Sequence, residues 1–172
     1  MSLDEGQKRF IGYLLSLAEK DKENRGALAE LRSGLGKSPG KMAKVHRHVV
    51  PFLPEEKYDD DWYYLIATLF GAFPEHCAGI SLAKAFNSLK TKSESMETRF
   101  IALLNAHPDN VGDHLRHTIS LLKTNEQPFD WFLLFDDILH WDNPSGFVQM
   151  KWARDFYRNE PSTDFFVTTD KG

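Results

Sequence analysis

The stretch that decides the fold is Trp62-Tyr63-Tyr64-Leu65-Ile66-Ala67-Thr68-Leu69-Phe70-Gly71-Ala72-Phe73. Large apolar residues recur in it at positions i, i+3, i+4, i+7, i+8 and i+11, which is the period of an α-helix with one buried face. Pro74 then ends the helix, because proline has no amide hydrogen to donate. The stretch therefore predicts a core helix, and no segment of the chain alternates with the period of a β-strand.

The same helical spacing recurs on both sides of this stretch. It predicts further helices over residues 10–17, 25–32, 41–49, 82–89, 96–104, 111–122, 131–138 and 148–156. Residues 74–80 carry no such pattern and indicate a linker. We therefore predict an all-α protein, a two-lobe helical bundle of about eight to nine helices, with lobes at residues 1–75 and 76–160 and a flexible tail at 161–172.

Several polar residues mark where these helices should begin. Asn24 is expected to cap the helix at 25–32, and Asp130 the helix at 131–138. Thr91-Lys92-Ser93-Glu94 matches a capping box, and Asp109 is expected to cap the helix at 111–122. In the helix at 41–49, the pattern places one set of side chains inward and another outward. The inward set is Met42, Val45 and Val49, and the outward set is Lys41, Lys44 and His48.

Composition excludes several classes of protein. The 172 residues are 41% hydrophobic, as in a folded protein, and carry a formal net charge of −4, unlike a dedicated basic nucleic-acid binder. Cys77 is the only cysteine, so no internal disulfide and no cysteine-based zinc site is possible. Neither a signal peptide nor a membrane span is expected. We predict a cytoplasmic protein without a cofactor.

The charges are unevenly distributed along the chain. Residues 25–52 hold six lysines and arginines against the single acidic residue Glu30, whereas residues 55–61 hold five acidic residues against Lys57. On a helix, Arg25 and Arg32 share the face opposite the leucines, and a helix–turn–helix would bring later basic residues to the same edge. This first basic set is Arg25, Arg32, Lys37, Lys41, Lys44 and Arg47.

Two further basic sets follow. The second is Lys84, Lys90, Lys92 and Arg99, and the third is Lys151, Arg154 and Arg158. A single charged run is usually only a solvated face, but three of them on an acidic chain favour a groove that holds the phosphate backbone of nucleic acid without reading bases.

Catalytic motifs are absent from the sequence. It contains no nucleophile elbow, no phosphate-binding loop and no dinucleotide fingerprint. Asp113, His114 and His117 would suit a metal-dependent phosphohydrolase, but a third and fourth ligand in register are missing. We therefore predict no catalytic residue and no metal site, and keep this enzyme as one alternative. The other is a helical scaffold whose basic patch docks an acidic protein.

Seven blocks of the chain, in this order, resemble the CasB family, the small subunit of the type I-E CRISPR surveillance complex, Cascade. The resemblance spans about residues 6–158. The blocks are Arg25–Arg32, Tyr64–Phe70, Ser81–Phe86, Arg99–Leu104, Ile119–Lys123, Asp130–Asp142 and Lys151–Tyr157.

The resemblance implies an all-α, non-catalytic subunit that pairs with a second copy and contacts the other Cascade subunits that hold the guide RNA. It implies a basic face that stabilises opened target DNA, especially the displaced single strand. The residues carried over on matched positions are Arg25, Arg32, Lys84, Arg99 and Arg154. The chain departs from the family at Ser33, Phe86 and Asn87, where the family often has arginine, which implies a thinner basic surface.

Overall fold

The computed structural model describes residues 2–20 and 24–158. These residues form nine α-helices and three short 3-10 helices, and no strand. The α-helices are α1 (Glu5–Ser16), α2 (Arg25–Arg32), α3 (His46–Val49), α4 (Asp60–Ala72), α5 (Leu82–Asn87), α6 (Ser95–Leu104), α7 (Val111–Thr124), α8 (Trp131–Leu139) and α9 (Phe147–Tyr157), and the 3-10 helices are η1 (Pro39–Lys41), η2 (Val50–Phe52) and η3 (Lys57–Asp59). The predicted all-α fold is confirmed. The predicted tail at 161–172 lies outside the described residues.

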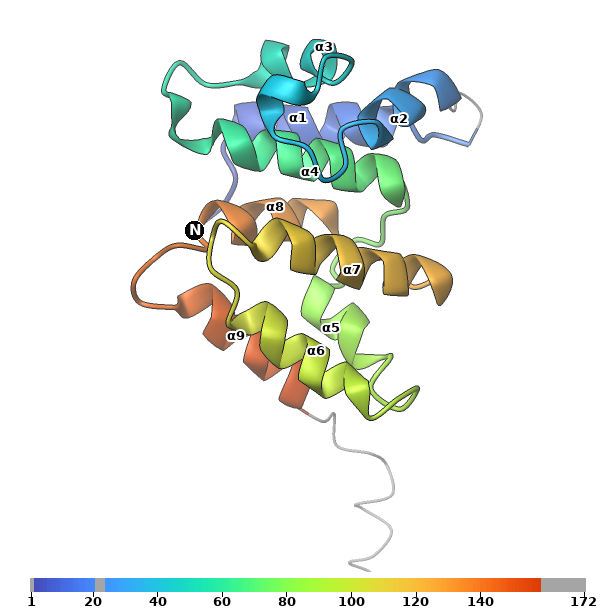
Figure 1. The fold of residues 1–172 in the computed structure, drawn as a ribbon, viewed down its shortest axis with the longest axis vertical. Helices are drawn as coiled ribbons and strands as arrows, with labels where there is room; N and C mark the ends of the chain where they lie inside the picture. The colour runs from blue at the N-terminus through green and yellow to red at the C-terminus, as the bar shows by residue number, and fades with distance from the viewer. Residues whose placement is uncertain (1, 21–23, 159–172) are drawn as a thin grey trace, which may run out of the picture.

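The helices are stacked along the long axis of the molecule (Figure 1). Helices α1, α2, α3 and α4 lie at one end, α5, α6 and α9 lie at the other, and α7 and α8 lie between them. Helix α4 contacts both α7 and α8, so it joins the first end to the middle layer. In the part of the chain that the structure describes, no helix is long and apolar enough to cross a membrane.

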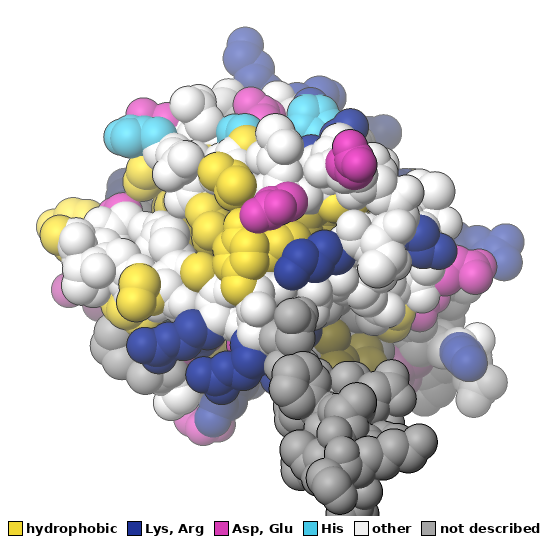
Figure 2. Space-filling view, turned by 90° about the horizontal axis from the view of Figure 1, so that it is seen from below, with side chains coloured by type: hydrophobic (Ala, Val, Ile, Leu, Met, Phe, Trp, Pro, Cys, Tyr) yellow, Lys and Arg dark blue, Asp and Glu magenta, His cyan; other side chains and the backbone are white. Residues whose placement is uncertain are grey.

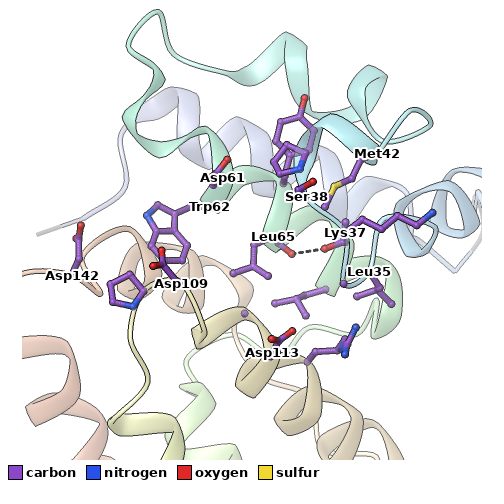
Figure 3. A pocket seen from close by; sticks show the side chains of 18 of the residues that line it. Leu35, Lys37, Ser38, Met42, Asp61, Trp62, Leu65, Asp109, Asp113 and Asp142 are labelled. Atoms are coloured by element: carbon purple, nitrogen blue, oxygen red, sulfur yellow. Dashed lines mark hydrogen bonds between the residues drawn. The ribbon is translucent and has the colours of Figure 1, made fainter.

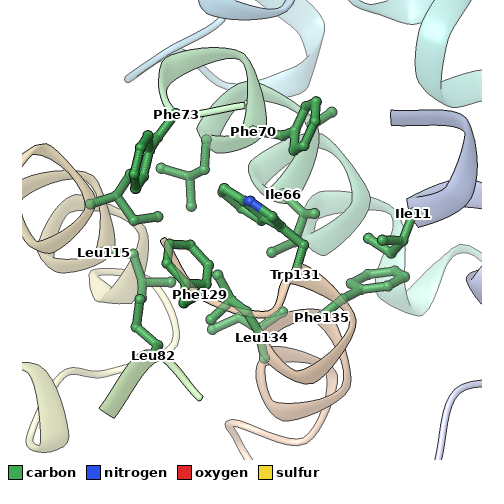
Figure 4. Packing of buried hydrophobic residues seen from close by; sticks show 14 of the residues in the cluster. Ile11, Ile66, Phe70, Phe73, Leu82, Leu115, Phe129, Trp131, Leu134 and Phe135 are labelled. Atoms are coloured by element: carbon green, nitrogen blue, oxygen red, sulfur yellow. The ribbon is translucent and has the colours of Figure 1, made fainter. Parts of the chain in front are cut away.

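Aromatic side chains from three helices form the centre of the core (Figure 4). Phe70 of α4 meets Trp131 of α8 edge to face at 5.4 Å between ring centroids, and Phe10 of α1 meets Phe135 of α8 at 5.4 Å. All four side chains are inaccessible to solvent. The buried cluster continues from here to α5, α6 and α9, across the boundary expected at residues 74–80. The division into lobes at 1–75 and 76–160 stays a prediction.

Helix α4 is buried on more than one face because α2 lies directly against it. A Cβ atom at Gly71 would lie 2.7 Å from Leu31 Cβ and 2.9 Å from the backbone nitrogen of Arg32, closer than real Cβ contacts come. Gly71 therefore permits the two backbones to approach. Gly34, just after α2, has the same function, since its Cβ would lie 2.7 Å from Thr68 Cγ2 of α4.

Two of the four predicted helix caps are correct. Asn24 accepts a hydrogen bond from the Ala27 amide at 2.9 Å, and Asp130 accepts from the amides of Phe132 and Leu133. The capping box at 91–94 is wrong, because α6 begins at Ser95 and its N-cap Glu94 has helical backbone angles and no side-chain cap. Asp109 is not a cap either, because α7 begins one residue later, after Asn110.

The helix predicted at 41–49 is much shorter in the structure. It is replaced by η1 and the single turn of α3. Met42, Val45 and Val49 are buried as expected, but His48, placed on the outer face by its spacing, is only 4% exposed. The irregular backbone between η1 and α3 breaks the helical register, so the spacing no longer determines which side chains face outward.

Candidate nucleic-acid interface

The first basic set lies on α2, on α3 and on the segment between them, at one end of the molecule (Figure 1). We call Arg25, Arg32, Lys37, Lys41, Lys44 and Arg47 the N-terminal basic surface; all six are exposed. Leu28 and Leu31 are buried on the opposite side of α2, which turns Arg25 and Arg32 outward as predicted. Within residues 2–20 and 24–158, no ion pair engages the ammonium groups of the three lysines.

Glu30 holds α3 beside α2. Arg47 Nη2 donates to Glu30 Oε1, and His48 Nε2 lies 2.9 Å from Glu30 Oε2. These hydrogen bonds from His48 and Arg47 lower the pKa of Glu30, so the carboxylate stays charged at neutral pH. The turn therefore folds back as the sequence predicted, but Arg47 has an acidic neighbour that offsets part of its charge.

His48 completes a buried chain of polar groups behind this surface. The Tyr13 hydroxyl lies 2.7 Å from His48 Nδ1. The Tyr13 hydroxyl at Nδ1 and the Glu30 carboxylate at Nε2 give each ring nitrogen of His48 a hydrogen-bond partner. Both ring nitrogens are thus satisfied, and the histidine positions Glu30 and, through it, Arg47.

Arg32 also contacts the fold itself. Its Nη1 donates to the Gly71 carbonyl oxygen at 3.2 Å, near the end of α4, where helix carbonyls lack intrahelical partners. A cation at this position is also favoured by the helix dipole. Replacing Arg32 would therefore change the packing of α2 on α4 as well as the surface charge.

The remaining predicted site residues lie at the opposite end of the molecule. Lys84 on α5, Arg99 on α6 and Arg154 on α9 are all exposed. Figure 2, which views this end from below, shows lysine and arginine side chains on both sides of an apolar patch. We call these three residues the C-terminal basic surface. The middle layer of α7 and α8 separates the two surfaces, so the structure does not bring all nine predicted residues into one groove.

Tyr157 is a residue of this end that the sequence patterns did not single out. Its ring is 43% exposed, its hydroxyl donates to Glu97 at 2.9 Å, and the Lys90 ammonium lies 5.2 Å from the ring centroid. Tyr157 follows Arg154 by three positions and so shares its helix face. The three-residue spacing in the sequence could therefore have predicted an exposed aromatic ring beside a cation. Such an arrangement is suited to stacking on a base.

The described residues do not form the metal site of the enzyme alternative. Asp113 and His117 are exposed on α7 and His114 is half-buried. Over residues 2–20 and 24–158, no group of three or more His, Cys, Asp or Glu side chains is placed to hold one metal ion.

A groove with mixed charge lies between the two basic surfaces (Figure 3). It has a volume of about 540 Å³ and lies between the turn after α2, the start of α4 and the start of α7. We call it the charged groove. Its polar and aromatic lining includes Lys37, Tyr58, Asp61, Trp62, Asp109, Asp113, Arg116 and Asp142. Trp62, expected in the core, is only half-buried and forms part of this lining.

Comparison with known proteins gives a consistent result. Residues 27–157 match the family described as CRISPR-associated protein Cse2. A CRISPR-associated protein Cse2 from Thermus thermophilus is 33% identical over 154 residues, which cover 87% of this chain and 89% of that protein.

Solved structures show the same fold. The crystal structure of CasB from Thermus thermophilus has a TM-score of 0.77 at 32% identity and covers 90% of this chain and 99% of its own. A chain of a CRISPR RNA-guided surveillance complex has a TM-score of 0.75 at 20% identity, with 96% of this chain and 97% of that chain covered. The latter likeness concerns the fold alone.

Proposed function

Because this chain belongs to the family of CRISPR-associated protein Cse2, we propose that it is a non-catalytic subunit of an RNA-guided surveillance complex. Its part there is to hold nucleic acid by the phosphate backbone and to stabilise opened target DNA. The observation that carries the nucleic-acid part is the N-terminal basic surface on a chain of net charge −4.

The chemistry of this surface fits backbone contact rather than base reading. The lysines at positions 37, 41 and 44 are exposed and have no ion pair with any of the described residues, so they are available to phosphates. Such contacts release condensed counterions, so they give affinity that depends on salt and not on sequence. A basic surface on an otherwise acidic protein also orients the molecule toward a polyanion.

The C-terminal basic surface supports a second contact with the same ligand or with the guide RNA. Lys84, Arg99 and Arg154 are exposed at the end of the molecule distant from α2 (Figure 1), and the exposed ring of Tyr157 shares the helix face of Arg154. Two weak sites joined by one rigid body gain avidity when both engage. The partners we propose are the other subunits of the complex, the guide RNA, the displaced strand of the target and a second copy of this chain.

The test is fluorescence anisotropy of the full chain with labelled single-stranded DNA of unrelated sequences over a salt series. The variant is Lys37→Gln/Lys41→Gln/Lys44→Gln, which leaves Arg32 and its bond to Gly71 intact. The matched control is Lys20→Gln/Lys57→Gln/Lys123→Gln, which removes the same charge from exposed positions elsewhere. We expect the log–log salt slope to become shallower by about 2 in the variant, at about 0.7 per lost phosphate contact.

Each outcome decides between functions. Equal losses in variant and control would contradict a dedicated nucleic-acid surface. No DNA binding at low salt, together with loss of assembly with partner subunits in the lysine variant, would instead support the scaffold alternative, in which the basic patch docks an acidic protein.

A further inference from the structure

We propose that the charged groove docks a lysine- or arginine-bearing segment of a partner protein. This goes beyond the proposed function, because it assigns a neighbouring site on the molecule to protein rather than to nucleic acid. The argument rests on the charges that line the groove, on how they are separated within it, and on two aromatic side chains.

The lining carries more negative than positive charge. Four aspartates face it, Asp61, Asp109, Asp113 and Asp142, against two cations, Lys37 and Arg116. In the described part of the chain, the carboxylates of Asp61, Asp113 and Asp142 have neither a hydrogen bond nor an ion pair. Asp109 pairs only with His107, at 3.4 Å, with both side chains highly exposed. These carboxylates are therefore available to a cationic ligand.

Three of the four aspartates lie at one end of the groove, and Asp113 lies apart from them (Figure 3). Figure 3 shows Asp61, Asp109 and Asp142 around Trp62, while Leu35 and Lys37 lie at the other end and Lys37 extends away from the aspartates. The charge at this end also acts on a residue beside it. Burial of Asp59 is the main reason why the pKa of its carboxyl group is raised, and the negative charge of Asp142 raises this pKa further. An incoming cation would relieve this repulsion.

Two aromatic rings add a second element of recognition for the same chemistry. Tyr58 is 89% exposed, which is rare for so large a side chain, and Trp62 follows it by four residues. Aromatic faces attract guanidinium and ammonium groups, with Trp and Tyr the better partners. Leu65 gives the groove an apolar wall for the methylene stem of a lysine or arginine.

The same features disfavour nucleic acid in this groove. A phosphate backbone would meet four carboxylates, and like charges brought together at an interface reduce affinity. The groove thus adjoins the N-terminal basic surface, with which it shares Lys37, but selects the opposite charge. One subunit therefore presents neighbouring sites to a polyanion and to a basic protein segment.

The test uses the full chain and a fluorescein-labelled hexa-arginine peptide, followed by anisotropy at low salt. The groove variant is Asp61→Asn/Asp113→Asn/Asp142→Asn, and the matched control is Glu19→Gln/Glu94→Gln/Glu126→Gln, which removes equal charge from exposed positions outside the groove. We expect the groove variant to weaken peptide binding about tenfold, because it removes three exposed charge pairs, and the control to change it less than about twofold. Tyr58→Ala should weaken binding about two- to fivefold.

Circular dichroism of each variant verifies that it is folded. Absence of saturable peptide binding, or equal losses in the groove variant and its control, would overturn the proposal. A loss of single-stranded DNA affinity that is larger in the groove variant than in the control would overturn it too, by assigning the groove to nucleic acid. The variant Lys41→Gln/Lys44→Gln changes only residues outside the groove lining. Loss of DNA binding by that variant therefore leaves the peptide result unaffected, and the two proposals fail separately.

Discussion

Asp137 is the most deeply buried acidic side chain of the described residues, at 3% exposure. Trp152 Nε1 donates to its Oδ2 at 2.7 Å, and Lys151 Nζ donates to its Oδ1. Burial raises the pKa of Asp137, while the bonds from Lys151 and Trp152 counteract that shift. The carboxyl group therefore provides the hydrogen-bond acceptor that the buried Trp152 indole needs, but its own burial costs desolvation energy.

This balance predicts different outcomes for two substitutions at the same position. Asp137→Asn keeps an oxygen acceptor for Trp152 and removes the buried charge, so we expect the free energy of unfolding to change by less than about 1 kcal/mol. Asp137→Ala leaves the Trp152 indole hydrogen without an acceptor and should cost about 2–3 kcal/mol. Urea denaturation at neutral pH measures both; equal destabilisation by the two variants would contradict the argument.

Individual residues also show which contacts could be predicted from the sequence and which could not. The six cations of the N-terminal basic surface could be predicted because they are close together in the sequence. The Glu30–Arg47 contact could not, because it joins positions 17 residues apart across an irregular turn. The charged groove was likewise not predictable, since Asp61, Asp113 and Asp142 come from three distant segments. Asp61 is on α4, Asp113 is on α7 and Asp142 follows α8, and the packing of α4 against α7 and α8 brings them together.

At the scale of helices, the contact between α2 and α4 depends on a glycine inside α4. Gly71 lies at the centre of this contact, and an added methyl group would meet backbone atoms of α2, including Leu28 O at 3.0 Å. Glycine normally weakens a helix relative to alanine, by about 1 kcal/mol. Here the close approach of two backbones outweighs that cost.

We therefore predict opposite effects for two glycine-to-alanine substitutions inside helices. Gly71→Ala should lower the free energy of unfolding by about 1–3 kcal/mol, because α2 must move away from α4. Gly12→Ala on α1 should raise it by about 0.5–1 kcal/mol, because its Cβ meets no atom within 4 Å. Thermal and urea unfolding of the two variants give the comparison, and stabilisation by both would refute the steric argument.

The existence of the helices was predictable, but several of their ends were not. Burial imposes the 3.6-residue period, so the helices around Phe70, Leu115 and Trp152 are apparent in the sequence. A cap depends on the backbone angles of a single residue. Several neighbouring polar residues could serve as the cap, so the sequence does not determine which of them does. The capping box at 91–94 predicted Thr91 as the N-cap and Glu94 inside the first turn, whereas α6 begins at Ser95 and Glu94 itself occupies the N-cap position.

At the scale of the whole molecule, one buried cluster connects all the layers. It begins with Phe10 at the α1 end, passes through Trp131 and Phe135 of α8, and reaches Phe100 and Phe156 at the far end, where the last two rings stack at 3.9 Å. Contacts of α8 with both α1 and α4 carry this core across the boundary predicted at residues 74–80. If the two halves of the chain separated, the apolar faces of α4 and α8 that contact each other would be exposed to water, at a large cost in free energy.

From this continuity we predict that the chain unfolds in a single cooperative transition, although the sequence pattern predicts two lobes. Phe10→Leu and Phe156→Leu create cavities at opposite ends, and each should lower the midpoint of that same transition by roughly 2–8 °C, for a loss of about 1–2 kcal/mol. Scanning calorimetry is the measurement, with agreement of the calorimetric and van't Hoff enthalpies as the criterion of cooperativity. If the halves were independent, two transitions would be resolved and each variant would shift only the one belonging to its own end. A single transition would mean that any ligand bound at either basic surface stabilises the opposite end as well, since both ends fold in the same equilibrium.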